Sequence, residues 1–153
     1  MSRQAASLPE DSPVNVAWAR DSSELAQAFE LRIEVFCDEQ GVPREEELDH
    51  RDEEALHVVA LAGDRVVGTL RVLVDGARAK IGRVAVARDY RRRGIAHRMM
   101  LLGLDGAREA GCSEAALTAQ TYAIALYEKS GFSVDSDVFE EAGMPHVWMV
   151  RAL

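Results

Sequence analysis

A run of arginines stands directly before a glycine in the stretch VAVARDYRRRGIAHRMM, residues 84–100, although the whole chain has a formal net charge of −8. These arginines are Arg88, Arg91, Arg92 and Arg93. Where a strand enters a helix through a glycine, the first backbone N–H groups of the helix have no partners, and an anion can accept their hydrogen bonds. The small residues Gly94 and Ala96 let a phosphate approach the backbone closely. These residue types at this spacing predict a phosphate or diphosphate site.

A solvated surface run is the alternative for the same arginines, because short patterns of this kind occur often by chance. The surroundings favour the anion site. Residues 80–86 (KIGRVAV) predict a strand, and residues 95–110 predict a helix capped by Gly111. The pattern therefore lies at the junction between strand and helix that phosphate binding requires.

The elements around this junction predict a mixed sheet with helices on its faces. Asp21 followed by Glu24 resembles a capping pair, and apolar residues at helical spacing then predict an amphipathic helix that ends near Gly41. A short turn at residues 63–65 joins two β-rich runs into a hairpin. Strands are expected over residues 14–19, 56–62, 66–74, 80–86, 113–119 and 145–150, and a second short helix over residues 123–130.

Length and composition indicate one domain and exclude several classes of partner. At 153 residues, 48% of them hydrophobic, the chain fits one core, which we expect over residues 16–153 after a flexible tail at residues 1–15. No apolar stretch approaches the roughly 20 residues that cross a bilayer, and the N-terminus has no apolar signal region. We therefore expect a cytoplasmic protein with no membrane partner. The acidic balance also argues against nucleic acid, whose phosphates need a basic face.

Cysteine and histidine spacing argues against two further kinds of site. Cys37 and Cys112 form neither a disulfide framework nor a metal-ligand cluster, and the acidic neighbours of Cys37 disfavour a reactive thiolate. The histidines at positions 50, 57, 97 and 146 have no metal-ligand spacing. We expect no metal.

An acidic run, EEELDHRDEE over residues 45–54, has no apolar period and predicts a loop. Its carboxylates can create a field that attracts a cationic amine. A solvated loop that contributes only solubility is the other interpretation.

Two ordered motifs resemble a known family. IGRVAVARDYRRRGIAHRMM resembles the acyl-CoA-binding motif of the GNAT N-acetyltransferase superfamily, and AALTAQTYAIALYEKSGF resembles the strand and helix that follow it there. LRIEVFCDEQGVP, ELDHRDEEALHVVA and AGMPHVWMV further resemble a bacterial branch called ElaA-like. The resemblance implies an α/β GNAT-like fold, in which helices flank a mixed, mostly antiparallel sheet, with acetyl-CoA as co-substrate and an amine as acceptor. It leaves open whether two copies form a homodimer.

The resemblance implies a cofactor role for the residues at the junction. Backbone amides of Val84 and Val86, on either side of Ala85, would pair with the pantetheine arm, and an amide near Val84 would bind the thioester oxyanion. The pyrophosphate would lie in the turn formed by Arg91, Arg92, Arg93, Gly94, Ile95 and Ala96, so that the arginines face coenzyme A. The family's usual second glycine is Ala96 here, which we expect to cost little.

Tyr127 in ALYEKSGF matches the position where the family places a tyrosine beside the coenzyme sulfur, so it would protonate the leaving thiolate. Without the resemblance, a tyrosine on an amphipathic helix is more often a core residue with a satisfied hydroxyl.

The general base is not evident from the sequence. The strand over residues 80–86 carries Lys80 and Arg83 but no carboxylate, whereas many relatives have a glutamate there. His146 is our preferred side chain for this role, Glu34 and His57 are weaker candidates, and proton release to water needs none of them.

These features predict an N-acetyltransferase that moves an acetyl group from the CoA thioester to a primary amine by direct attack in a ternary complex. Because the strand carboxylate is missing, a non-catalytic acyl-CoA-binding sensor or interaction module is the alternative. A transferase that acts on transfer RNA is a third hypothesis, which the net charge of −8 disfavours.

Overall fold

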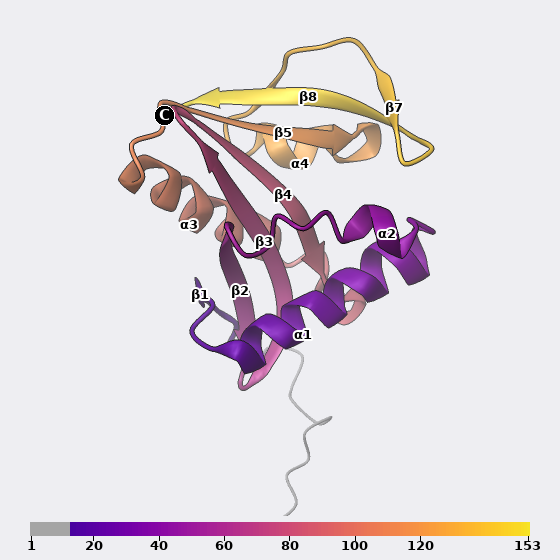
Figure 1. The fold of residues 1–153 in the computed structure, drawn as a ribbon, viewed down its shortest axis with the longest axis vertical. Coiled ribbons are helices and arrows are strands. Elements are labelled where there is room, and N and C mark those ends of the chain that lie inside the picture. Colours follow the sequence, from indigo (N-terminus) through magenta and orange to yellow (C-terminus); the bar gives the residue numbers. More distant parts are fainter. Residues whose placement is uncertain (1–12) are drawn as a thin grey trace, which may run out of the picture.

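The computed structural model describes residues 13–153, in which one mixed sheet has the strand order β1-β2-β3-β4-β5-β8-β6 and β7 pairs with β8 (Figure 1). The strands are β1 (Asn15–Trp18), β2 (Leu56–Ala62), β3 (Arg65–Asp75), β4 (Arg78–Val86), β5 (Glu114–Gln120), β6 (Ser133–Val134), β7 (Phe139–Glu141) and β8 (Met144–Ala152). Among these pairs only β4 and β5 run parallel. The predicted fold class, a mostly antiparallel mixed sheet with flanking helices, is confirmed.

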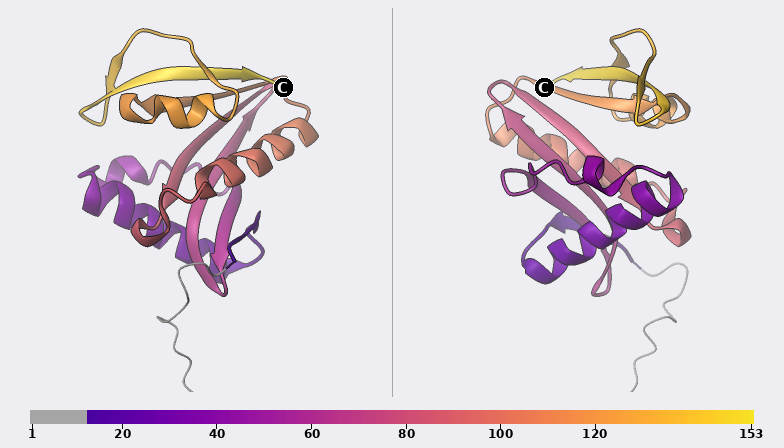
Figure 2. Two further views of the ribbon diagram at one scale, coloured as in Figure 1. Left: turned by 180° about the vertical axis from the view of Figure 1, so that it is seen from behind. Right: turned by 45° about the vertical axis from the view of Figure 1, so that its right-hand side comes forward.

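Helices cover both faces of this sheet. They are α1 (Ser22–Arg32), the π-helical segment η2 (Ile33–Glu39), α2 (Arg44–Glu47), the 3-10 turn η3 (Arg88–Tyr90), α3 (Ile95–Glu109), the 3-10 turn η4 (Thr121–Ala123) and α4 (Ile124–Glu128). Helix α1 lies in front of the β2–β3 region in Figure 1, and α3 crosses its other face, as the view from behind shows (Figure 2). Both helices pack on β3. The core that they enclose contains the fully buried side chains of Val58, Leu70, Ile81, Met99 and Leu104.

Several element boundaries differ from the sequence-based prediction. The helix expected to reach Gly41 ends as α1 at Arg32 and continues as the wider η2. Strands β6 and β7 were not predicted, because two or three residues are too few to show a period. Of the tail expected over residues 1–15, residues 1–12 lie outside the described part, and Asn15 already begins β1.

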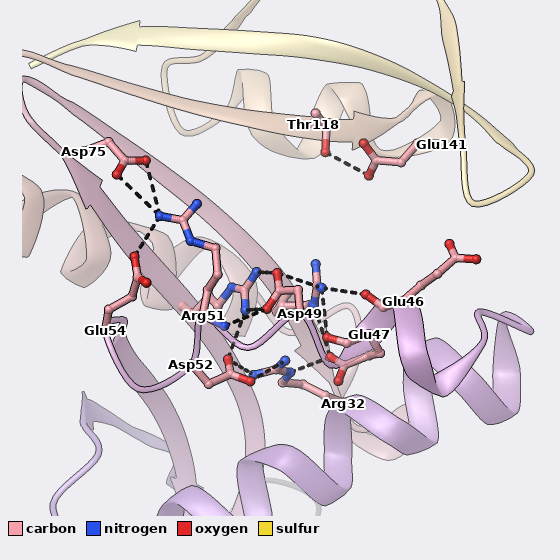
Figure 3. A network of polar contacts seen from close by, with 12 residues as sticks. Arg32, Glu46, Glu47, Asp49, Arg51, Asp52, Glu54, Asp75, Thr118 and Glu141 are labelled. Atoms are coloured by element: carbon pink, nitrogen blue, oxygen red, sulfur yellow. Dashed lines mark hydrogen bonds and ion pairs between the residues drawn. The ribbon is translucent and has the colours of Figure 1, made fainter.

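The acidic run is not the free loop that its composition predicted. It begins within α2, and three of its carboxylates pair with three arginines from α1, β3 and β4 (Figure 3). We call this group the arginine–carboxylate cluster; its members are Arg32, Arg71, Arg83, Glu47, Asp49 and Asp52. Arg32 Nε donates to Glu47 Oε2 at 2.6 Å, and the side chains of both residues are 2% exposed. Arg71 donates to both Asp49 and Asp52.

The cluster corrects both earlier interpretations of residues 45–54. A solvated loop is wrong for Glu47, Asp49 and Asp52, because buried guanidinium groups hold their carboxylates. Neutralisation by these arginines also removes the three carboxylates from any field that could attract a cation. Only the exposed members Glu45 and Glu46 keep free carboxylates on α2 in the described structure.

The cluster predicts a loss of stability in acid. Hydrogen bonds from Arg71 hold the pKa of Asp49 well below its ordinary range. The contribution of Asp49 is therefore fully present above the ordinary aspartate pKa of about 4 and is lost as the pH falls further. Asp49→Asn should lower the free energy of unfolding at pH 7 by about 1–3 kcal/mol, measured by urea denaturation.

The difference between wild type and Asp49→Asn should narrow as the pH drops from 4 towards 2. Asp75→Asn is the matched control, because Asp75 meets Arg51 in an exposed pair and should cost at most about 1 kcal/mol. A gap between Asp49→Asn and wild type that stays constant down to pH 2 would contradict the role given to Asp49.

Candidate functional site

A cleft opens where β4 and β5 part. Their parallel pairing joins only Arg78–Lys80 to Glu114–Ala116, and beyond these residues the two strands diverge, as Figure 1 shows. A cavity of about 370 Å³ lies in this region. Its walls include residues of η2, α2, β4, β5, α4 and the β7–β8 hairpin. The residues predicted to do the chemistry lie around this opening or at the nearby start of α3.

A bulge interrupts β4 at the cleft. Thr69 of β3 pairs with Ala85, but Arg71 pairs with Gly82, so Arg83 and Val84 together face a single residue of β3. Arg83 has a φ of 53°, a left-handed conformation that is costly for any residue but glycine. A bulge leaves a residue out of the strand ladder, so its backbone groups are available to a ligand. Val84, the predicted oxyanion residue, lies at this break and lines the cavity.

The arginine–carboxylate cluster holds the bulge in place. The Arg83 guanidinium donates to the backbone oxygen of Glu47 at 2.9 Å, to the Glu47 carboxylate at 3.2 Å and to Asp49 at 3.3 Å. These contacts offset the strain at Arg83 and fix α2 against β4. The hydrogen bonds therefore tie the position of α2 to the backbone of the bulge.

The predicted phosphate turn has the backbone that an anion site needs. Gly94 has a φ of 76° and precedes α3, and no side chain caps the N-terminus of this helix. A Cβ built on Gly94 meets no atom within 4 Å, so the space above the turn is open. The Ile95 side chain is buried in the core and Ala96 is half-buried, which anchors the first helical turn. The amide groups at the start of α3 are thus available to a phosphate.

The arginines of the turn differ from one another. The Arg91 guanidinium donates to the backbone oxygen of Val86 at 2.8 Å and to the Glu39 carboxylate at 2.9 Å. Arg93 donates to the backbone oxygen of Asp89 and lies over the Tyr90 ring. Arg92 has a φ of 66° and is exposed. Arg91 and Arg93 therefore contact groups of the protein itself, and the expectation that these arginines face a cofactor stays a prediction.

Tyr127 of α4 lines the cavity, and its expected place beside a coenzyme sulfur stays a prediction. No described residue hydrogen-bonds to its hydroxyl, and the ring packs against the core. Burial, with a smaller contribution from Tyr122, raises the pKa of Tyr127 to about 12. The phenol is therefore protonated at neutral pH and can donate a hydrogen bond into the cavity.

His146 of β8 also lines the cavity, opposite β4. Its Nδ1 lies 2.8 Å from the backbone oxygen of Met144, and its Nε2 lies 3.8 Å from Glu141 Oε2. Glu141 was not among the predicted site residues. It stands on β7, a strand too short to detect, and it reaches the cavity only because β7 folds back on β8.

The weaker base candidates lie elsewhere. The His57 ring contacts the backbone oxygen of Asp52 at 2.9 Å and does not line the cavity, and Glu34 lies along a different groove. Cys37 and Cys112 are free thiols. Burial, together with the charge of Glu47, raises the pKa of Cys37, which favours the unreactive thiol form.

Two further observations concern metals and membranes. Within residues 13–153, no group of three or more His, Cys, Asp or Glu side chains is arranged to hold a metal ion. No helix in the same range is long and apolar enough to span a bilayer.

Comparison with known proteins places this geometry in a family. A model of the acetyltransferase (GNAT) domain matches residues 19–153. The uncharacterized N-acetyltransferase YjcF of Bacillus subtilis is 36% identical over 134 residues, which cover 87% of this chain and 96% of YjcF. The structure of Escherichia coli ElaA superposes with a TM-score of 0.79 and 26% identity, covering 90% of this chain and 99% of ElaA. An acyl-CoA N-acyltransferase from Pseudomonas aeruginosa superposes with a TM-score of 0.80 and 29% identity, covering 92% of this chain and all (100%) of that one.

These similarities confirm the family predicted from the two sequence motifs, including the ElaA-like resemblance. They extend over nearly the whole described chain and over nearly the full length of each relative. The divergence of β4 and β5, the bulge at Arg83 and the uncapped start of α3 all lie within the matched domain, and the chain belongs to the GNAT family of N-acetyltransferases.

Proposed function

We propose that this protein transfers the acetyl group of acetyl-CoA to a primary amine by direct attack within a ternary complex. The observation that carries the proposal is one cavity, between β4 and β5, that brings together the bulge at Val84, the phenol of Tyr127 and the imidazole of His146. Each meets a different need of acyl transfer: an oxyanion donor, a donor to the leaving sulfur and a base.

The chain offers binding positions for two parts of coenzyme A, the pyrophosphate and the pantetheine arm. The uncapped amides after Gly94 suit the pyrophosphate, and the edge of β4 from Val84 through Ala85 to Val86 suits the amide-bearing pantetheine arm. The name of the Pseudomonas aeruginosa relative, an acyl-CoA N-acyltransferase, supports the same ligand. The open space above Gly94 supports the fit of a phosphate there.

Tyr127 acts by hydrogen bonding rather than by full proton transfer. With a pKa of about 12, its phenol is a far weaker acid than a thiol, whose ordinary pKa is about 8.5. The hydroxyl therefore stabilises the leaving sulfur, and the proton that remains on sulfur comes from the attacking amine.

The amine must lose a proton before it attacks. An aliphatic amine with a pKa near 10 is only about one part in a thousand neutral at pH 7, a deficit of roughly 4 kcal/mol. His146, whose ring borders the same cavity, can accept that proton. An amine panel with acetyl-CoA and detection of free thiol tests the proposal, and binding without turnover across a broad panel would favour the non-catalytic module instead.

The phosphate seat predicts a ligand-dependent thermal shift. Acetyl-CoA and CoA should raise the melting temperature, because binding to the native state stabilises it by mass action. Gly94→Glu should abolish this shift by placing a side chain and a negative charge at the anion site. Gly76→Glu is the matched control, because Gly76 also has a positive φ and open space but lies in the β3–β4 turn. A folded Gly94→Glu variant that keeps the full shift would place the phosphates elsewhere.

The role of Tyr127 predicts that removing its hydroxyl lowers the rate of the chemical step. Tyr127→Phe should keep acetyl-CoA affinity within about twofold and lower the single-turnover rate by about 10- to 100-fold, because one hydrogen bond to a charged group is lost. Rapid mixing of the acetyl-CoA complex with excess amine measures this rate without interference from product release. A wild-type single-turnover rate would exclude Tyr127 from the reaction, whereas lost CoA affinity would assign its hydroxyl to cofactor positioning.

The free carboxylate of Glu46 predicts a modest preference for cationic acceptors. Glu46 lines the cavity, and in Figure 3 its side chain points away from the arginine–carboxylate cluster. Glu46→Gln should raise the KM of a cationic amine by about 2- to 5-fold at low salt, and the effect should fade at high salt. Glu45→Gln is the control, because it removes the same charge from a neighbouring position outside the cavity lining. If Glu45→Gln raises the KM as much as Glu46→Gln does, the preference comes from the net charge of the protein and not from the position of Glu46.

A further inference from the structure

Two hydrogen-bond acceptors, His146 Nε2 and Glu141 Oε2, lie close together in the wall of the cavity. A carbonyl oxygen can only accept, so the 2.8 Å contact with Met144 requires His146 Nδ1 to carry the proton. In the neutral ring, Nε2 then presents a lone pair. Glu141 Oε2 lies 3.8 Å from that nitrogen. No described residue donates a hydrogen bond to Nε2.

The structure holds both acceptors in place. Thr118 of β5 donates a hydrogen bond from its Oγ1 to Glu141 Oε2 at 3.2 Å. In Figure 3 this pair lies on the other side of the cleft from Glu46. His146 is paired in the sheet on both sides, with Gln120 of β5 and Phe139 of β7. Its ring stacks on Phe139, with centroids 6.2 Å apart, and its side chain is 7% exposed.

The turn that carries Glu141 is tight. Ala142 has a φ of 52° and Gly143 a φ of 76°, so the β7–β8 connection uses two left-handed residues in succession. This geometry is typical of a two-residue hairpin turn, and it costs energy at Ala142 because only glycine adopts it freely. The hairpin thereby places Glu141, whose side chain is 49% exposed, and Ala142 along the cavity wall, while the neighbouring Glu140 lies outside it.

A protonated amine is the ligand that this pair fits. Two acceptors at 3.8 Å with no donor between them repel each other, and an ammonium group supplies three N–H donors and a positive charge. We propose that Glu141 and His146 together form the seat of the acceptor ammonium, in which Glu141 holds the charge and His146 removes the proton. The inference rests on the proposed function and extends it to the substrate class: an amine that binds in its protonated form.

The transfer of the acetyl group conserves protons and electrons. The ammonium gives one N–H proton to His146 Nε2, and the freed lone pair on nitrogen forms the new bond to the thioester carbonyl carbon. The C–S bond then breaks with its electron pair on sulfur, and the second nitrogen proton ends on that sulfur. Glu141 stabilises the imidazolium by its charge until His146 releases its proton to solvent. The products are the N-acetyl amine, the free thiol and one proton.

The experiment compares a charged acceptor with a neutral one. We measure kcat and KM at pH 7 for the best aliphatic amine of the panel and for O-methylhydroxylamine, which is neutral at that pH. Glu141→Gln should raise the KM of the aliphatic amine by about 3- to 10-fold at low salt, because a charged hydrogen bond to a half-exposed carboxylate is lost, and should change that of O-methylhydroxylamine by less than about twofold. His146→Gln should lower kcat for the aliphatic amine by about 100-fold or more. Glu140→Gln, which removes the same charge from the neighbouring residue of β7, should match wild type.

A binding measurement covers the case in which no amine of the panel is turned over. In the CoA complex, n-butylammonium chloride should shift the ¹⁵N resonance of His146 Nε2 in wild type and in Glu140→Gln, but not in Glu141→Gln. Equal behaviour of Glu141→Gln and Glu140→Gln in both assays would overturn the seat. That result would leave the proposed function intact as long as CoA still raises the melting temperature and free thiol still forms. If CoA does not raise the melting temperature of the wild-type protein and no free thiol forms, the proposed function itself is refuted.

Discussion

The short parallel contact between β4 and β5 is the constraint on which the site depends. Three residues of each strand pair, and the two then separate, so that a continuous sheet becomes two walls with polar backbone edges between them. Unpaired backbone groups are costly when they are buried, and a ligand with amide groups satisfies them. The bulge at Arg83 belongs to the same arrangement, because it turns a residue out of the ladder where the walls part.

Charge pairing between α1, α2 and β4 stabilises the structure beside this opening. The buried pair of Arg32 and Glu47 would be expensive if either partner stood alone, so each fixes the other and, through Arg83, the bulge. The acidic segment thereby does structural work near the cavity, and only Glu46 among its cavity-lining carboxylates remains free of an arginine. The carboxylates thereby neutralise Arg71 and Arg83, whose side chains line the cavity.

The cavity brings together a hydrogen-bond donor and a hydrogen-bond acceptor, to which we assign different roles in acyl transfer. Burial makes Tyr127 a persistent hydrogen-bond donor near the sulfur position that we propose, whereas the hydrogen bond from His146 Nδ1 to Met144 leaves its other nitrogen as an acceptor. Both side chains line the same cavity, so a hydrogen-bond donor and an acceptor reach one space. The strand β4 has no carboxylate there, and Glu141 brings one to the cavity from β7 instead.

The sequence by itself determined the family, the mixed sheet, the glycine turn before α3 and the identity of Tyr127 and His146 as candidates. Local patterns carry that information: glycine allows the left-handed turn, apolar residues repeat at helical or strand spacing, and a motif preserves order along the chain. Only the tertiary structure decided which carboxylates of the acidic run are neutralised, where Arg91 turns its guanidinium, and that Glu141 meets His146. Glu47 and Arg32 lie 15 residues apart, and Arg83 and Glu47 lie 36 apart, so no local period links them. Such pairs form because a buried charge without a partner is costly, and the arrangement of the strands and helices determines which opposite charges lie close to it.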